Sequence, residues 1–351
     1  MLAQRWGGDC MDRQNGTTRR AMLQGAIALA TSGFVARAFG QPPAAANRPP
    51  PPPGTRLIML GTRGGPGVSV DRSESASAVV VDGVPYLVDC GYGTMRALVA
   101  AGIGNQSVST IFLTHLHDDH TADIAALLSH QWTGSKMTPT NVYGPYATDR
   151  TVKGAIEFFR ANVEIRTVDE GRKEKPEDMF FGHDVDVGND PVRVFADDKV
   201  VVTAVTNTHY PERFVARMQH RSLGYRFETG TRSICFSGDT AYSANVVKLA
   251  RGADVFVCEV MDHRTWENNM ARAREQAAAG NTESVARHVA ETHSTPGDVG
   301  RMAKEASVKT VVLNHQLRGQ AAQGWTIAAF IDGVRAEFDG NVIVGEDQLV
   351  I

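Results

Sequence analysis

Short runs of apolar and β-branched residues, separated by polar turns, dominate the chain from residue 55 onward. Runs of this kind are typical of buried β-strands. The pattern predicts strands over residues 56–60, 78–81, 86–89, 109–113, 141–145, 199–205, 222–228, 232–236, 254–259 and 310–314. Helices are predicted over residues 94–101, 151–161, 267–290 and 295–306, and another begins at Thr121. Strands come first and then alternate with helices, which indicates packed layers of sheet and helix. The polar stretch 169–198 predicts loop with short strands.

The first 54 residues differ in kind from the rest. Arg19 and Arg20, with Leu23 at the usual offset, form a twin-arginine pattern, and the apolar run 26–36 leads to an A-x-A site at residues 36–38. We therefore expect a signal peptide over 1–38, recognised by the twin-arginine export machinery, and a periplasmic or secreted protein. The run is too short and too weakly apolar for a stable membrane span. The proline-rich residues 39–54 predict an extended linker, and the folded domain is expected over 55–351.

Charge and cysteine content narrow the classes of function. Residues 1–38 hold five Lys or Arg and two Asp or Glu, so 31 basic and 37 acidic residues remain, a formal charge of −6. This balance, without any run of basic residues, indicates that nucleic acid is not a partner. Cys90, Cys235 and Cys258 lie in or next to apolar runs and are expected to be buried free thiols. A disulfide between two of them is the alternative.

Metal-binding residues cluster after the predicted strand 109–113. His115, His117, Asp119 and His120 occupy a strand-to-helix loop in the order His-x-His-x-Asp-His. Imidazole and carboxylate groups together suit Zn²⁺, with Mn²⁺ or Fe as substitutes. Three further candidates, His209, Asp239 and His315, each follow another predicted strand. Because groups at strand ends meet at one edge of packed sheets, we expect all of these side chains to converge.

This constellation resembles that of the metallo-β-lactamase-fold hydrolases over about residues 55–320. The resemblance implies an α+β fold, a four-layer αβ/βα sandwich, and two Zn²⁺ ions. It assigns His115, His117 and His209 to the first ion and Asp119, His120 and His315 to the second, with Asp239 as the bridging carboxylate. Asp119 also counts among the catalytic residues.

Two further stretches resemble motifs of the tRNase Z-like branch. Glu259 stands where that branch has the Glu of a His-Glu-Ala-Thr motif, and the sequence His293-Ser294-Thr295 matches its His-Ser-Thr motif. The resemblance implies that Glu259 orients His293 and that His293 donates a proton to the leaving group.

The sequence-based hypothesis is an exported dinuclear hydrolase that cleaves a small sulfate ester or phosphodiester with a metal-bridging hydroxide, as in the arylsulfatase- and phosphodiesterase-like members. The basic, Gly/Pro-containing arm with which tRNase Z enzymes hold tRNA has no counterpart in residues 121–209. Alternatives are a lactonase or other carboxyl-ester hydrolase, a tRNA 3′-processing endonuclease, and a metal-binding protein without turnover. The oligomeric state stays open.

Overall fold

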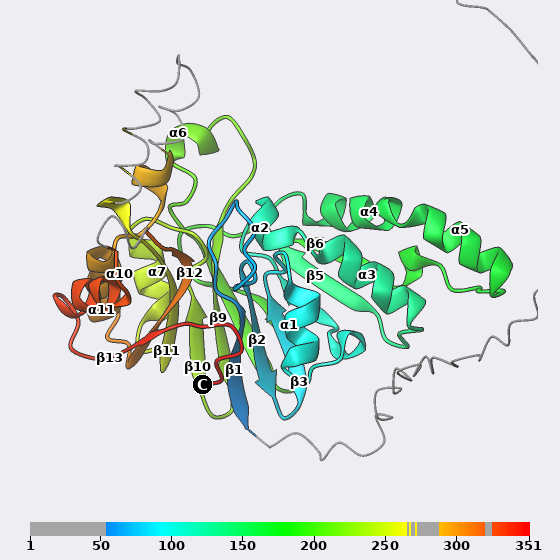
Figure 1. Cartoon of the computed structure of the whole chain (residues 1–351), viewed down its shortest axis with the longest axis horizontal. Coiled ribbons are helices and arrows are strands. Elements are labelled where there is room, and N and C mark those ends of the chain that lie inside the picture. Colours follow the sequence, from blue (N-terminus) through cyan, green and yellow to red (C-terminus); the bar gives the residue numbers. More distant parts are fainter. Residues whose placement is uncertain (1–53, 265–266, 268–270, 272–287, 320–324) are drawn as a thin grey trace, which may run out of the picture. The chain divides into compact units, whose positions relative to one another are not determined.

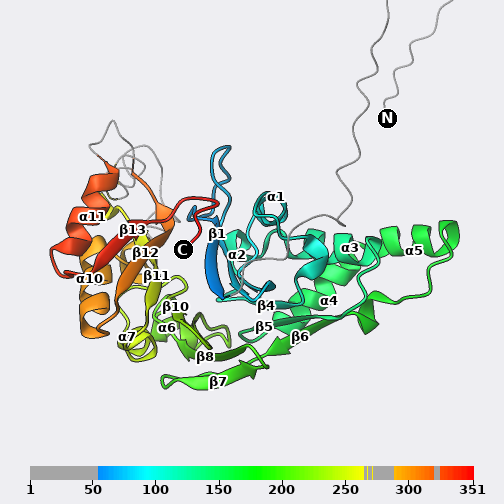
Figure 2. The same ribbon diagram turned by 90° about the horizontal axis from the view of Figure 1, so that it is seen from below.

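The computed structural model describes residues 54–264, 267, 271, 288–319 and 325–351. Two mixed β-sheets face each other, and helices lie on their outer sides (Figures 1 and 2). The first sheet has the strand order β1-β2-β3-β4-β5-β6. Its strands are β1 (Thr55–Gly61), β2 (Ala76–Val81), β3 (Val84–Val88), β4 (Thr110–Phe112), β5 (Thr140–Gly144) and β6 (Phe180–Asp184). From β3 to β6 neighbouring strands are parallel.

The second sheet has the order β13-β12-β11-β10-β9-β8-β7, with parallel pairing from β10 to β13. Its strands are β7 (Val192–Ala196), β8 (Val200–Thr206), β9 (Leu223–Thr229), β10 (Ser233–Phe236), β11 (Val255–Met261), β12 (Thr310–Leu317) and β13 (Asn341–Val344). Parallel strands bring their carboxyl ends to one edge, which is where the functional residues lie.

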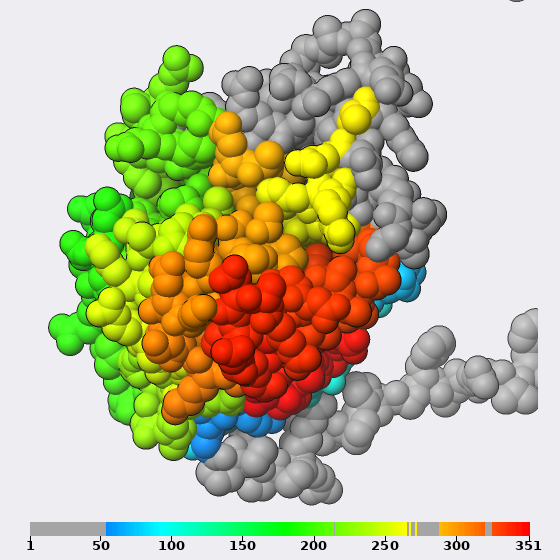
Figure 3. Space-filling model, turned by 90° about the vertical axis from the view of Figure 1, so that its left-hand side faces the viewer, coloured from blue at the N-terminus to red at the C-terminus, as the bar shows by residue number. Residues whose placement is uncertain are grey.

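Each sheet is covered by its own helices. The first is covered by α1 (Thr94–Ala100), α3 (Ile124–Thr133), α4 (Thr148–Phe158) and α5 (Arg160–Asp169). The second is covered by α7 (Ala244–Ala250), α10 (Pro296–Glu305) and α11 (Ile327–Arg335). Figure 3 shows the outer face formed by the last two, in orange and red. The short helices α2 (Asp118–Thr121) and α6 (Glu212–Val215) lie in connecting segments, as do the 3₁₀ turns η2 (Asn105–Ser107) and η3 (Pro176–Asp178).

Alternation along the strands produces the layers. In β1, Leu57 and Met59 pack between the two sheets, whereas Ile58 and Leu60 pack against the helices. Successive side chains of a strand point to opposite faces, so one strand contributes to two cores. The result is helix, sheet, sheet and helix in four layers, and the predicted αβ/βα sandwich is confirmed.

The helix α10 begins as its sequence predicts. The Thr295 side chain accepts a hydrogen bond from the backbone of Asp298, and the Asp298 side chain accepts one in return from the Thr295 backbone. Pro296 occupies the first turn, where its missing N–H costs nothing. This capping box fixes the loop that carries His293.

The structure adds elements that the hydrophobic pattern did not predict: the short helices α2 and α6, the helices α5, α7 and α11, and the strand β13. The stretch 169–198 contains η3 and the two edge strands β6 and β7, which are partly exposed and therefore weakly patterned. Most of the predicted helix 267–290 lies outside the described residues, as do the predicted signal peptide and all but the last residue of the linker, so these stay predictions. Within the described part, no helix combines the length and apolarity that a bilayer crossing needs.

Candidate metal centre

All seven residues predicted to bind metal come together at one edge of the two sheets. They form two groups of nitrogen and oxygen atoms that lie within 4.8 Å of one another: His115, His117 and His209 in the first group, and Asp119, His120, Asp239 and His315 in the second. The loop after β4 supplies the His115–His120 cluster, His209 follows β8, Asp239 follows β10, and His315 lies in β12. The predicted convergence of strand ends is therefore present.

Hydrogen bonds in the first group orient lone pairs toward a common point. His209 Nδ1 lies 3.2 Å from the Thr292 carbonyl oxygen, which only accepts, so Nδ1 carries the proton and Nε2 keeps its lone pair. Nε2 of His209 is 3.2 Å and Nε2 of His115 is 3.0 Å from Nδ1 of His117. Burial lowers the pKa of His115 and of His209 well below 6.5, so both rings are neutral. Neutral imidazoles arranged in this way fit a divalent cation.

The second group joins two carboxylates to two imidazoles. His315 Nε2 lies 3.0 Å from Asp119 Oδ2 and 3.1 Å from Asp239 Oδ2. His120 Nε2 and Asp239 Oδ1 are 3.3 Å apart, yet both are buried without a hydrogen-bond partner. Burial would lower the pKa of His120, but Asp239, Asp89 and Asp119 raise it well above 6.5. A buried site with this much negative charge needs a proton or a cation, and the donor set fits a divalent metal ion.

Asp239 stands between the two groups. Its Oδ2 lies 3.9 Å from His115 Nε2 of the first group and 3.1 Å from His315 Nε2 of the second. The side chain is 2 % exposed, and Gly238, in the left-handed region at φ 59°, precedes it in the turn after β10. This position agrees with the bridging role that the sequence resemblance implies.

Asp89 is a functional residue that sequence reasoning did not identify. Its Oδ2 accepts a hydrogen bond of 2.8 Å from His120 Nδ1, and its Oδ1 accepts one of 2.7 Å from the Thr114 backbone. The first bond places the proton of His120 on Nδ1 and directs Nε2 into the second group. The available signal was that Asp89 ends the strand next to the metal-bearing one.

The glycine-rich loop after β1 serves the metal centre. The Gly65 N–H donates a hydrogen bond of 2.7 Å to Asp119 Oδ2. A Cβ atom on Gly65 would collide with the Asp119 side chain, and one on Gly64 would lie 2.8 Å from the His315 ring. Glycine is therefore required here for close backbone approach to the two side chains.

His315 reaches the site through a β-bulge, whereas the sequence placed it after a strand end. The strand β12 continues to Leu317, and its register with β11 shifts so that Asn314 pairs with Glu259 and Gln316 with Val260. His315 is the extra residue, with φ at 40°. Bulges re-aim a side chain at the cost of local strain, and this one turns the imidazole toward Asp119 and Asp239.

Glu259 and His293, the predicted catalytic pair, are in contact. His293 Nδ1 lies 2.9 Å from Glu259 Oε2, and the Thr240 backbone N–H donates to Glu259 Oε1. Burial raises the pKa of Glu259 and lowers that of His293. Because Nδ1 is held by Glu259, Nε2 is the ring nitrogen of His293 available to the cleft.

A cleft of about 260 Å³ opens over these residues. Its lining includes His117, Asp119, His293 and His315. It also includes His288, a histidine outside the predicted set, whose ring centroid lies 5.3 Å from that of His209. From the sequence alone, nothing distinguished His288 from a surface histidine.

Cys90, Cys235 and Cys258 are buried free thiols, as expected.

The chain matches the Beta-lactamase superfamily domain over residues 85–316. It is 26 % identical over 298 residues to Ribonuclease Z of Mycobacterium bovis (strain BCG / Pasteur 1173P2), covering 83 % of this chain and 95 % of that protein. Its identity to Ribonuclease Z of Mycobacterium sp. (strain KMS) is 30 % over 263 residues, which cover 74 % of this chain and 84 % of that protein. The short form of human tRNase Z shares the fold, with a TM-score of 0.55 and 22 % identity over 84 % of this chain and 98 % of that one.

These relatives overturn two expectations drawn from the sequence. A small sulfate ester or phosphodiester as substrate is wrong, and so is the exclusion of nucleic acid, because relatives spanning most of the chain are ribonucleases by name. These relatives do not test export, which stays a prediction. The error came from net charge and a missing basic arm: net charge averages over the whole surface, whereas binding depends on groups near the site. The fold, the matched domain and these relatives establish that the chain belongs to the metallo-β-lactamase superfamily, among hydrolases related to ribonuclease Z.

Proposed function

We propose that this protein is a zinc-dependent endoribonuclease that removes the 3′ extension of precursor tRNA. The observation that carries the proposal is the combination of ribonuclease Z relatives across most of the chain with a complete set of candidate ligands and a Glu259–His293 pair at one site. Either feature alone would leave the substrate class open, since the fold hosts many hydrolases.

The ligand chemistry supports two zinc ions. Histidine nitrogens and the carboxylates of Asp119 and Asp239 are borderline and hard donors, a set that suits Zn²⁺ and also accepts Mn²⁺ or Fe. Bound cations would supply a water of lowered pKa as nucleophile and offset the negative charge that grows on the phosphate. Asp89, Thr292 and Gly65 fix the orientation of the ligands before the cations bind.

His293 is placed to handle the leaving oxygen. Glu259 holds its Nδ1, and Nε2 is available to the cleft that also exposes His117 and Asp119. The raised pKa of Glu259 lets its carboxyl donate to Nδ1, which leaves the ring proton of His293 on Nε2. A proton delivered from Nε2 to the 3′ oxygen as the P–O bond breaks, with the Glu259 proton passing to Nδ1, would leave a 3′-hydroxyl on the tRNA and a 5′-phosphate on the released trailer. General acid assistance of this kind contributes about 10²- to 10⁴-fold in rate.

The test is cleavage of a precursor tRNA that carries a 3′ trailer. Protein reconstituted separately with Zn²⁺, Mn²⁺ or Fe²⁺ is incubated with this RNA, and the product ends are mapped. We expect one cut near the end of the acceptor stem, fastest with Zn²⁺ and abolished by chelation. The same RNA without a trailer is the control and stays intact. Protein that holds two ions per chain and leaves the precursor uncut would refute the proposal.

A further inference from the structure

A second, larger cleft lies beside the metal centre. This side cleft has a volume of about 560 Å³, within the range of small-ligand sites. Four segments line it: Tyr146 before α4, residues 185–189 after β6, parts of residues 206–223 around α6, and Asn245 in α7. We propose that the side cleft is a nucleobase subsite, in which Tyr146 stacks on the base of a nucleotide close to the scissile bond. The ligand class rests on the RNA-cleaving function proposed above.

One side chain separates the side cleft from the candidate metal ligands. Tyr210 lines the cleft, and its ring centroid lies 5.0 Å from that of His209 and 5.6 Å from that of His117. Stacked nucleotides rise about 3.4 Å each along a strand. An RNA chain whose phosphate lies at the metal centre therefore reaches the side cleft within its next one or two nucleotides.

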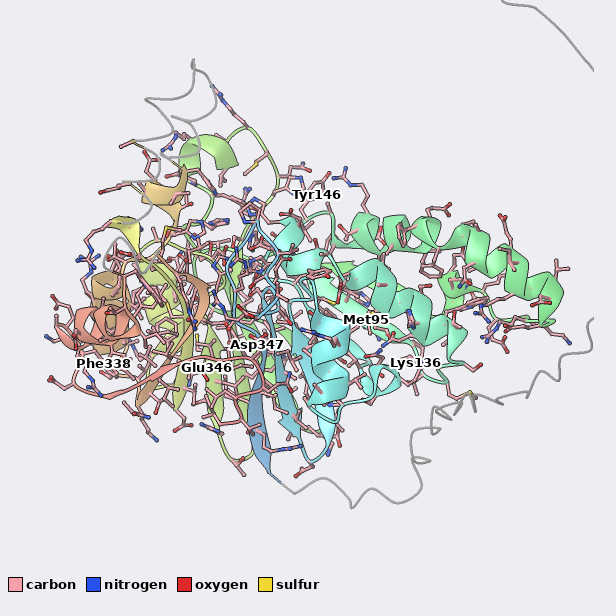
Figure 4. All side chains as sticks on the ribbon, in the orientation of Figure 1. Met95, Lys136, Tyr146, Phe338, Glu346 and Asp347 are labelled. Atoms are coloured by element: carbon pink, nitrogen blue, oxygen red, sulfur yellow. The ribbon has the colours of Figure 1, made fainter. Side chains whose placement is uncertain are left out.

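Tyr146 has the exposure and support of a stacking platform. Tyr146 lies in the segment that leads into α4 (Figure 4). It is 44 % exposed, and its ring meets that of His220 at a centroid distance of 5.5 Å in an edge-to-face arrangement. The next residue, Ala147, has a φ of 80°, which is costly for a residue with a Cβ. Asp184 holds this turn, because its carboxylate accepts the N–H groups of Ala147 and Asp149, each at 2.9 Å. An exposed aromatic ring on a fixed turn binds bases through their π-faces.

The side cleft is also lined by two side-chain amides, those of Asn189 and Asn245. Asn245 Nδ2 donates to Asn189 Oδ1 at 3.0 Å and to the Thr206 carbonyl at 3.1 Å. Among the residues that the structure describes, Asn245 Oδ1 and Asn189 Nδ2 have no hydrogen-bond partner. Paired amide donors and acceptors of this kind bind the edges of bases.

The charges favour a base over a phosphate in this cleft. Asp186 and Glu212 contribute carboxylates to the lining, and Arg221 is the one guanidinium among the described lining residues. Arg221 Nη1 already donates to the carbonyls of Met218 and His220. Two carboxylates against one arginine repel an anionic phosphate, whereas a neutral base meets no such penalty.

The experiment measures binding and cleavage of RNA by the full chain with its metals. Binding uses a short fluorescent single-stranded RNA with phosphorothioate linkages, which slow cleavage. Tyr146→Leu removes the ring at similar volume, Tyr146→Phe keeps it, and Phe158→Leu, at a 76 % exposed aromatic on α4, is the matched control. Tyr146→Leu should weaken binding roughly 5- to 150-fold, the range that loss of one base stack gives. Tyr146→Phe and Phe158→Leu should bind as the wild type does, and metal content should not change.

A set of RNAs with a single abasic position gives a test that needs no substitution. One abasic position should weaken wild-type binding as much as Tyr146→Leu does, and the two changes together should cause no further loss. Equal affinity of Tyr146→Leu and the wild type, or losses that simply multiply, would overturn the subsite. Precursor tRNA that is bound but not cleaved would refute the proposed function alone, because the binding comparison still decides whether a base occupies the side cleft.

Discussion

Replacing Asp89 with Asn tests how the second ligand group is oriented. Both Asp89 oxygens act as acceptors: Oδ1 for the Thr114 N–H at 2.7 Å and Oδ2 for His120 Nδ1 at 2.8 Å. Asn has one acceptor oxygen, so one of the two N–H groups must face an amide N–H instead. Asp89 is 4 % exposed, and water cannot easily replace the lost acceptor.

The loss of metal affinity in this variant depends on which of the two hydrogen bonds the Asn side chain keeps. A buried backbone N–H left without an acceptor costs about 1–3 kcal/mol, so the amide oxygen in Asp89→Asn keeps its bond to Thr114 and the NH₂ group turns toward His120. His120 then moves its proton from Nδ1 to Nε2, which blocks the nitrogen that faces Asp119 and Asp239. Restoring the binding tautomer costs the same ~1–3 kcal/mol, so affinity for the second ion should fall roughly 5- to 150-fold. Loss of an orienting partner commonly weakens metal binding about 10- to 100-fold.

A chelator titration followed by metal analysis measures this loss. Asp89→Asn should release the second-group ion at a lower chelator concentration than the wild type does, and it should keep the first-group ion at wild-type affinity. Asp123→Asn is the matched control, because a single oxygen of Asp123 accepts both the Gly93 and Met95 N–H groups, each at 3.1 Å, and Asn can do the same. Equal affinities in Asp89→Asn and the wild type, or an equal loss in Asp123→Asn, would show that Asp89 does not set the His120 tautomer.

Four further outcomes are expected. Asp239→Ala should lower the content of both ions, since its carboxylate lies between the two groups; retention of two ions by metal analysis would contradict a bridge. His293→Ala should slow cleavage of an alkyl phosphodiester up to ~10²–10⁴-fold and that of a nitrophenyl diester much less, because nitrophenolate leaves without a proton; equal losses would exclude a general acid. On acidification the ion of the second group should leave before that of the first. Neighbouring carboxylates raise the pKa of His120 and His315, whereas burial lowers the pKa of His115 and His209, so protons displace the second-group ion at a higher pH. Metal content measured against pH tests this order. Arg19→Lys with Arg20→Lys should keep the protein, with its signal peptide uncleaved, in the cytoplasm. Unchanged export of this double variant in cell fractionation would rule out the twin-arginine signal.

The sequence predicts most candidate metal ligands well because their positions follow from residues that are close together along the chain. The His115–His120 cluster occupies one loop, and His209 and Asp239 each follow a strand that the apolar pattern marks clearly. The strands β8 and β10 run in the same direction on either side of the antiparallel β9, so the ends that carry His209 and Asp239 lie at the same edge of the sheet. Thr295 and Asp298, three residues apart, are likewise a local signal for the start of α10.

The remainder depends on pairings between distant segments, which periodicity does not encode. His315 enters the site only because β12 gains one residue against β11, and the strand pattern 310–314 contains no sign of that bulge. Asp89 acquires its role because β3 and β4 pair in parallel, which places it beside Thr114 and His120. The substrate class was mistaken for the same reason: net charge is a sum over the chain, whereas the proposed base-binding cleft arises where Tyr146 meets residues about 40 to 100 positions away. Prediction of function from sequence is therefore strongest for ligands within one loop and weakest for surfaces built by tertiary contact.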